Sequence, residues 1–252
     1  MLAPETLADR FQDLQAGTLA RAKLTLRKRA RRCDAIMKLA VIVALAVSTT
    51  SFAQERFTPA RLVGGDAPPL PVQNIAGGQV LVEAAVDRTG SVSGVKVLRT
   101  TPPFDDAVTG AVRGWRFSPA EVDGADGTRG SVETSVLVAV ILRPPTLLNG
   151  PTIGELPKDV APPSDHVPFP IAISVPWYPP LALAGGVVML EVQVRPEGSV
   201  SKAAVIRSGP GFDSAAIDAI RQWTFRPARL GGSPVSSVAY VVFGFSQPII
   251  VP

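Results

Sequence analysis

Residues 178–228 read YPPLALAGGVVMLEVQVRPEGSVSKAAVIRSGPGFDSAAIDAIRQWTFRPA, and the chain contains a second, related copy of this stretch. Residues 70–120 align with it without a gap at a constant offset of 108, and 23 of the 51 pairs are identical. The identical pairs keep Gly, Trp and Pro in register, which chance does not do over such a span. The 252-residue chain is therefore predicted to be a tandem duplication, and each copy is long enough to fold around a small core.

A β-hairpin opens each copy. Val188, Leu190 and Val192 alternate with polar residues, as in a half-buried strand. Gly198 takes the left-handed position of the following turn, and Gly90 stands at the same place in the first copy. Apolar residues then return at positions 200, 203 and 205, which predicts the second strand.

A helix and a third strand follow the hairpin. Asp213 is expected to cap the helix with its side chain, and Pro227 ends it. Its apolar face is formed by residues at helical spacing: Phe212, Ala216, Ile220 and Trp223. The third strand is predicted over residues 235–245, and over 132–142 in the first copy. The fold class is thus α+β, with two tandem ββαβ units, each a small three-stranded antiparallel sheet with one packed helix.

Five segments follow from this pattern. They are a leader over residues 1–53, a short spacer over 54–69, the first copy over 70–142, a Pro-rich linker over 143–176 and the second copy over 177–252. The linker holds nine prolines in 34 residues, which favours an extended and semi-rigid chain.

The leader carries the pattern of an export signal. From Met37 it reads MKLAVIVALAVSTTSFAQE, with a basic start, an apolar run and small residues before Gln54. Its uncharged stretch is 16 residues long, shorter than the roughly 20 that span a bilayer. We expect cleavage after Ala53; the alternatives are a retained membrane anchor and a buried core helix. The 36 residues before Met37 are either an upstream extension of the true start or a long basic n-region, which could lie as a basic helix on anionic lipid.

Charge and reactive residues exclude several functions. Residues 1–53 hold nine of the 25 Lys and Arg residues and four of the 21 acidic ones, so the remaining chain is almost neutral and nucleic-acid binding lacks support. Cys33 and His166 are single residues of their kind, and His166 is expected to be solvent-exposed in the linker. Glu83 and Glu191 recur on the polar face of the first strand, but in separate copies. We therefore expect no enzyme, no cofactor and no metal.

Several motifs together resemble the C-terminal domain of TonB-family proteins. They are Tyr178-Pro179, the first strand, the Gly198 turn, the Asp213 helix and the closing Trp-x-Phe-x-Pro-Ala of residues 223–228. The second copy matches this pattern over residues 178–245; the first matches over 70–142, with Leu70-Pro71 in place of Tyr-Pro. The resemblance implies a periplasmic or exported protein that binds proteins and not nucleic acid. The implied partners are peptides of outer-membrane receptors or inner-membrane motor subunits, with the membrane contacted only through an uncleaved leader.

Residues with a structural role are expected at the two turns and helix ends: Trp115, Phe117, Pro119, Trp223, Phe225, Pro227, Gly90 and Gly198. The resemblance places a peptide-binding site at Tyr178 and Pro179 and along the third strand: Val238, Tyr240, Val241, Val242 and Phe243. Tyr178 has an alternative role as a ring that caps the sheet edge.

The third strand is apolar on both faces, so both faces are expected to be covered. A contact between the two copies is one cover, and a docked peptide that adds a strand is the other. Three functional hypotheses follow. They are an exported module that binds partner peptides in outer-membrane transport, a membrane-anchored energy transducer, and an envelope scaffold whose copies bind each other.

Overall fold

The protein's structure, a computed structural model, describes residues 57–70, 77–124, 127–145, 153–155, 160–161, 163–180, 182 and 184–247. All of them belong to the unit formed by Glu55–Pro252; the other unit is Met1–Gln54. The leader, with its expected signal peptide, lies outside the described residues. Among the described helices, none has the length and apolar character needed to cross a membrane.

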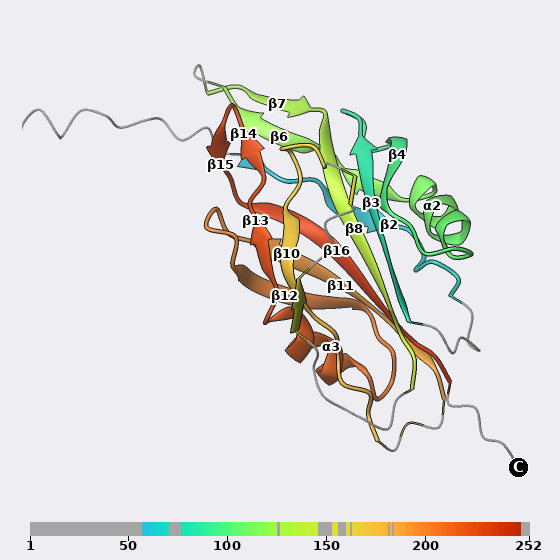
Figure 1. The fold of residues 1–252 in the computed structure, drawn as a ribbon. Coiled ribbons are helices and arrows are strands. Elements are labelled where there is room, and N and C mark those ends of the chain that lie inside the picture. Colours follow the sequence, from blue (N-terminus) through green and yellow to red (C-terminus); the bar gives the residue numbers. More distant parts are fainter. Residues whose placement is uncertain are drawn as a thin grey trace, which may run out of the picture. The chain divides into compact units, whose positions relative to one another are not determined.

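One six-stranded sheet joins the two copies (Figure 1). The first copy supplies β3 (Gly78–Val86), β4 (Val92–Arg99) and β8 (Thr134–Arg143). The second supplies β11 (Gly186–Val194), β12 (Val200–Arg207) and β16 (Ser237–Phe245). The strand order is β12-β11-β16-β8-β3-β4, so the third strand of each copy lies in the middle. Pairing is antiparallel within each copy and parallel between β8 and β16.

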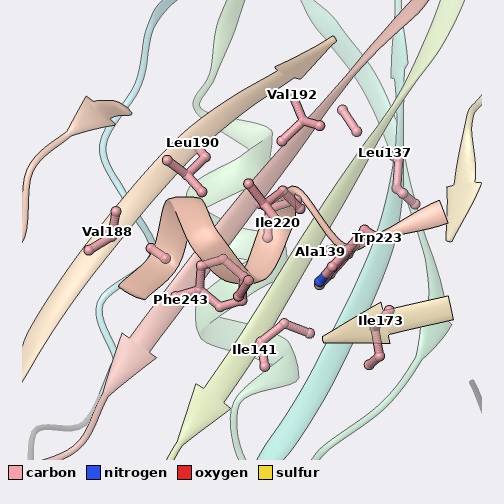
Figure 2. Packing of buried hydrophobic residues seen from close by; sticks show 14 of the residues in the cluster. Leu137, Ala139, Ile141, Ile173, Val188, Leu190, Val192, Ile220, Trp223 and Phe243 are labelled. Atoms are coloured by element: carbon pink, nitrogen blue, oxygen red, sulfur yellow. The ribbon is translucent and has the colours of Figure 1, made fainter. Parts of the chain in front are cut away.

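The two helices pack on opposite faces of this sheet. Helix α2 (Asp105–Arg113) covers a cluster with Val80, Val138 and Tyr240, and α3 (Asp213–Ile220) covers one with Leu190, Leu137 and Phe243. Figure 2 shows the second cluster, where Ile220 and Trp223 lie over Leu137, Ala139 and Ile141 of the first copy. Alternate residues of β8 and β16 enter each cluster, so each helix packs on strands of both copies. This explains why the third strands are apolar on both faces.

An extended segment before each copy pairs with short strands of that copy. In the first, β1 (Phe57–Thr58) pairs with β6 (Ala120–Asp123), and β2 (Arg61–Gly64) pairs with β5 (Arg116–Ser118). In the second, β10 (Phe169–Ser174) pairs with β13 (Thr224–Arg226) and with β9 (Ile153–Glu155). We call residues 57–67 arm 1 and residues 160–175 arm 2. Both arms lie within the segments expected to be the spacer and the Pro-rich linker.

Further short strands lie between the helix and the long last strand of each copy. β7 (Arg129–Val132) pairs with β6, and β14 (Arg229–Leu230) pairs with β15 (Ser233–Pro234).

The α+β class agrees with the sequence prediction. The simple ββαβ unit is not confirmed, because three short strands lie between the helix and the long last strand of each copy. Two separate three-stranded sheets are not confirmed, because the six strands form one sheet through the β8–β16 pair. The sequence pattern defines which strands a copy contributes, but not the partner of an apolar edge.

The expected side-chain cap of the second helix is wrong. Phe212 is the N-cap residue and makes no side-chain cap. Asp213 is the first helical residue, and its Oδ1 instead accepts the Gly209 N–H (N···O 2.9 Å). Asp105 accepts the Thr101 N–H in the same way in the first copy (2.8 Å). The carboxylate thus secures the loop that leads into the helix, and its negative charge lies beside the helix N-terminus.

Candidate functional site

Each copy holds its arm through a tryptophan. The Trp115 indole Nε1–H donates to the carbonyl of Asp66 (2.9 Å), and the Trp223 indole donates to that of Ser174 (2.8 Å). Both indoles are almost completely buried. Asp66 and Ser174 are themselves 108 positions apart, so the duplicated unit includes the arms. The two tryptophans therefore anchor an arm as well as the core.

The two hairpin turns need glycine. Gly90 and Gly198 have φ values of +84° and +87°. Each carbonyl accepts a backbone N–H, from Phe117 (2.8 Å) or Phe225 (2.9 Å). A Cβ at Gly90 would lie 1.8 Å from the carbonyl oxygen of Phe117, and one at Gly198 would lie 2.0 Å from that of Phe225. Pro119 and Pro227 lie beside the same turns.

Tyr178 lies inside the molecule and is 4% exposed. Its hydroxyl donates to the carbonyl of Ser246 (2.8 Å), and its ring packs edge-on against Phe212 and Phe245. Burial raises the pKa of its hydroxyl. Pro179 is half-buried beside it. This is the arrangement of a ring that closes the end of the sheet.

The third-strand residues of the expected peptide site lie in the centre of the sheet. All of them are at most 4% exposed: Val238, Tyr240, Val241, Val242 and Phe243. β16 is hydrogen-bonded to β11 along one edge and to β8 along the other. A peptide can add a strand there only if β16 separates from β8 or from β11, because neither edge of β16 is open. The structure divides these residues between the two faces of the sheet. Val241 and Phe243 share a buried cluster with Tyr178, whereas the other three lie in the opposite cluster: Val238, Tyr240 and Val242. Together they form no common exposed surface.

Tyr240 joins the two copies on the α2 face. Its ring packs on Trp115 and Phe117 of the first copy, at centroid distances of 5.9 and 5.8 Å. The Leu62 N–H of arm 1 donates to its hydroxyl oxygen (2.7 Å), and the hydroxyl donates to Glu191 (3.4 Å). Burial strongly raises the pKa of this hydroxyl. Arg61 also lies 3.5 Å from Glu191, so arm 1 is fixed on the second copy.

Glu83 has the corresponding role on the opposite face. Ser164 of arm 2 donates to its two carboxylate oxygens through its backbone N–H (3.0 Å) and its hydroxyl. Arg226 then donates to the Ser164 carbonyl (3.2 Å). Burial raises the pKa of Glu83, but the hydrogen bonds from Ser164 and Ser135 and the charge of Lys96 outweigh it, so the pKa is lowered. Glu83 and Glu191 thus act on opposite faces and form no carboxylate pair.

The outer edges of the sheet differ between the copies. We call the outer side of Val200–Arg207 the β12 edge; in the described part of the chain no strand pairs with it or with the outer side of β4. On β4, the Ala161 N–H of arm 2 donates to the carbonyl of Leu98 (2.9 Å), and Leu98 is 3% exposed. Ile206 stands at the equivalent position of β12 and is 44% exposed.

A hollow of about 420 Å³ adjoins Ile206, and we call it the β12 hollow. Its lining comes from arm 1 and from the hairpin of the second copy: Leu62, Val63, Gly64, Gly65, Asp66, Ala67, Met189, Ile206 and Arg207. Val63 is 75% exposed. Ile206 on the β12 edge and Val63 of arm 1 are exposed aliphatic side chains that line one hollow, which makes a suitable place for an extended peptide.

Nothing in the described residues indicates catalytic or metal chemistry. Among them, no group of three or more His, Cys, Asp or Glu side chains is placed to hold a metal ion. His166 is exposed, as expected. Gly90 begins the GSVSG stretch, where Val92 occupies the position that a nucleophilic serine needs.

Sequence reasoning missed Ile206 and Val63. Extending the 108-residue offset to arm 1 pairs Val63 with Ile171, and Leu98 pairs with Ile206 inside the aligned region. The pairs are visible in the sequence, but no aligned pair within the two arms is identical, and the first identical pair, Pro68 and Pro176, comes directly after them. Nothing in the sequence shows that arm 2 covers Leu98 while Ile206 stays exposed.

Comparison with known proteins agrees with this duplicated architecture. No match was found among curated proteins. The family model for the Gram-negative bacterial TonB protein C-terminal domain matches twice, over residues 68–138 and 175–246. The two matches cover more than half of the chain and coincide with the two copies that share the sheet. The chain therefore belongs to the TonB C-terminal family and carries its domain as a tandem duplication.

Proposed function

We propose that this protein is exported to the periplasm and binds peptides of partner envelope proteins by strand addition, in support of outer-membrane transport. The observation that carries the proposal is the double match to the TonB C-terminal family, whose domains interact with proteins such as outer-membrane receptors. The signal-peptide pattern of residues 37–54 supports export.

The fold itself supports strand addition as the mode of binding. Both arms are extended segments that pair with strands of the repeats, at β2–β5 and β10–β13. A third such contact is the Ala161–Leu98 hydrogen bond at the outer side of β4. Backbone groups at a strand edge offer the same bonds to a peptide from another protein. The β12 edge is the longest outer strand without such a contact in the described residues.

The scaffold hypothesis has one observation in its favour. The β8–β16 pair closes the third-strand edges of the two copies against each other. A protein whose copies only bind each other needs no external peptide. The anchored-transducer hypothesis depends on retention of residues 39–53 and is separated from the first by the state of the leader.

Two measurements test the proposal. Intact mass and N-terminal sequencing of the protein from fractionated native host should give a soluble periplasmic product that begins at Gln54. Calorimetric titration of that product with synthetic peptides from the periplasmic N-terminal segments of the host's outer-membrane receptors should show binding, with scrambled peptides as the control. A membrane-bound product that retains residues 39–53 would support the anchored transducer. A periplasmic product that binds no receptor peptide would support the scaffold.

A further inference from the structure

The contact that covers β4 in the first copy indicates what could bind at the equivalent strand, β12, of the second copy. β4 and β12 have the same β-bulge: opposite β4 it lies between Leu81 and Val82 of β3, and opposite β12 between Met189 and Leu190 of β11. Leu98 and Ile206 are the residues that the bulge leaves without a Cα partner. A bulge re-aims local groups away from the ladder. The carbonyl of Leu98 accepts the Ala161 N–H there.

The contact at β4 also shows what kind of chain fits. Val160 and Ala161 are small apolar residues of an extended segment, and both pack against the buried cluster that contains Leu98. They bring Leu98 to 3% exposure, whereas Ile206 remains 44% exposed next to Met189 and the 75% exposed Val63. Among the residues that the structure describes, the second copy therefore lacks a cover of about two residues and one backbone donor.

The positive charge of β12 favours an acidic residue next to the apolar one in the bound segment. Its sequence VSKAAVIR contains Lys202 and Arg207, both exposed, and no acidic residue. Arg207 also lines the β12 hollow, as does the exposed Asp66 of arm 1, so the acidic group of a partner is placed on the Arg207 side. A partner segment with a carboxylate next to its apolar residue complements this edge, since opposite charges steer and orient association.

The maturation expected for the chain leaves this position to a partner. The residues 108 positions before Val160 and Ala161 are Phe52 and Ala53. Cleavage after Ala53, as in the proposed function, removes both of them. A mature chain that begins at Gln54 has no equivalent of the two residues that cover Leu98.

We propose that the β12 edge binds an extended segment of a partner protein, whose backbone N–H bonds to the Ile206 carbonyl. Its apolar side chain fills the β12 hollow between Ile206 and Val63, and an acidic side chain lies beside Lys202 or Arg207. This assignment rests on the proposed function, namely that the repeats bind partner peptides, and it locates the binding on the outer second strand of the sheet.

The test uses the mature protein and a probe taken from its own arm 2. The probe is a capped peptide of residues 159–165, DVAPPSD, titrated into ¹⁵N-labelled mature protein while backbone amide shifts are followed. Within the chain, Val160 and Ala161 are tethered close to Leu98 and so have a high effective concentration there. The free peptide lacks this tether and should bind weakly, and NMR detects such weak binding. The largest shifts should occur at residues 200–207 and at arm 1. Shifts confined to other regions, or none at millimolar peptide, overturn the assignment.

Matched variants decide which side chains act. Ile206→Ser and Val63→Ser should each weaken the probe by about fivefold or more, because apolar contact is lost. Ile171→Ser is the control, since Ile171 is the equivalent of Val63 in the second arm, is 55% exposed and lies outside the β12 hollow. It should leave affinity within about twofold. Equal affinity for Ile206→Ser and the unsubstituted protein contradicts the proposal.

Charge provides an independent readout. Arg207→Gln should weaken DVAPPSD by about threefold at low salt, with a smaller difference at high salt. The amide analogue NVAPPSN should bind equally to both proteins. If Arg207→Gln leaves DVAPPSD binding unchanged at low salt, the acidic part of the proposal is wrong.

The outcomes separate this inference from the proposed function. Receptor peptides that bind without any effect of Ile206→Ser leave the proposed function in place and refute the β12 site. Failure of the probe and of all receptor peptides refutes both. A concentration-dependent dimer of the mature protein that Ile206→Ser abolishes would identify a second copy as the occupant and overturn the partner assignment.

Discussion

The two outer strands of the sheet, β4 and β12, derive from one duplicated sequence but have different surroundings. Arm 2 bonds to the Leu98 carbonyl and covers its side chain, whereas the equivalent Ile206 is 44% exposed. The core around them is closely matched, with both tryptophans buried and bonded to an arm. The two copies therefore share the same packing around their tryptophans. They differ at the outer strands, where arm 2 covers β4 and the equivalent position of β12 is exposed.

Replacing the two tryptophans that anchor the arms should have the largest effect on stability. Trp115→Ala and Trp223→Ala should each lower the free energy of unfolding by about 3–5 kcal/mol, because each removes a buried ring and an arm contact. Guanidinium unfolding of both variants measures the effect. Trp177→Ala is the control; its side chain is 41% exposed and should cost less than about 1 kcal/mol. A large loss for only one anchor would show that the copies are not energetically equivalent.

The turn glycines test the same equivalence at the backbone. Gly90→Ala and Gly198→Ala should each cost about 2 kcal/mol or more, because φ is positive and a Cβ would meet a carbonyl oxygen. Chemical unfolding of both variants gives the values. Gly94→Ala is the matched control, since φ is not positive there and nothing lies within 4 Å of the added Cβ. That variant should be neutral or slightly stabilising, and a loss similar to that of Gly90→Ala would contradict the strain argument.

The Tyr240 hydroxyl tests a second difference between the copies, because it holds arm 1 whereas a carboxylate, Glu83, holds arm 2. Tyr240→Phe should lower the unfolding free energy by about 1 kcal/mol, because the Leu62 N–H loses its acceptor. Hydrogen exchange at the Leu62 amide should rise more than exchange in arm 2, where Ser164 bonds to Glu83 instead. An unchanged Leu62 exchange rate would show that the hydroxyl does not hold arm 1.

Glu83 gives the smallest expected effect and tests arm 2 through pH. Its pKa is lowered in the folded state from the ordinary value of 4.5, so its contribution is complete above pH 4.5 and is lost as pH falls through the folded value. Glu83→Gln should therefore cost roughly 0.5–1 kcal/mol near neutral pH and progressively less in acid. Unfolding free energies across this pH range provide the test. Ser164→Ala should reduce the same pH dependence; an unchanged acid limb in both variants would refute this linkage.

The elements of each copy could be read from the sequence because their signals are local. Alternation at Val188 and Leu190, the turn at Gly198 and the spacing of Ile220 and Trp223 predict hairpin and helix. The joining of the sheets could not be read in this way, since it depends on which apolar edge meets β16. The two-sided apolar character of residues 238–243 indicated that both faces are covered, and the structure shows one face in the cluster under α2 and the other in the cluster under α3.

The candidate site was less accessible to sequence reasoning than the fold. The family resemblance pointed to β16, whose residues turn out to be buried between β11 and β8. Ile206 is an ordinary strand residue in the sequence. Its significance comes from its 44% exposure, whereas Ala161 of arm 2 covers the equivalent Leu98, and the sequence alone does not show this difference.

The parallel ladder between β8 and β16 has a consequence for how the molecule folds and unfolds. It pairs residues 102 positions apart, such as Ala239 with Leu137, and both core clusters contain side chains from both strands. Closing so long a loop is slow, so the ladder is expected to form late and to raise contact order. Neither copy has a complete core by itself. The duplicated domain should therefore melt as a single cooperative unit, with one heat-absorption peak for Glu55–Pro252 and not two.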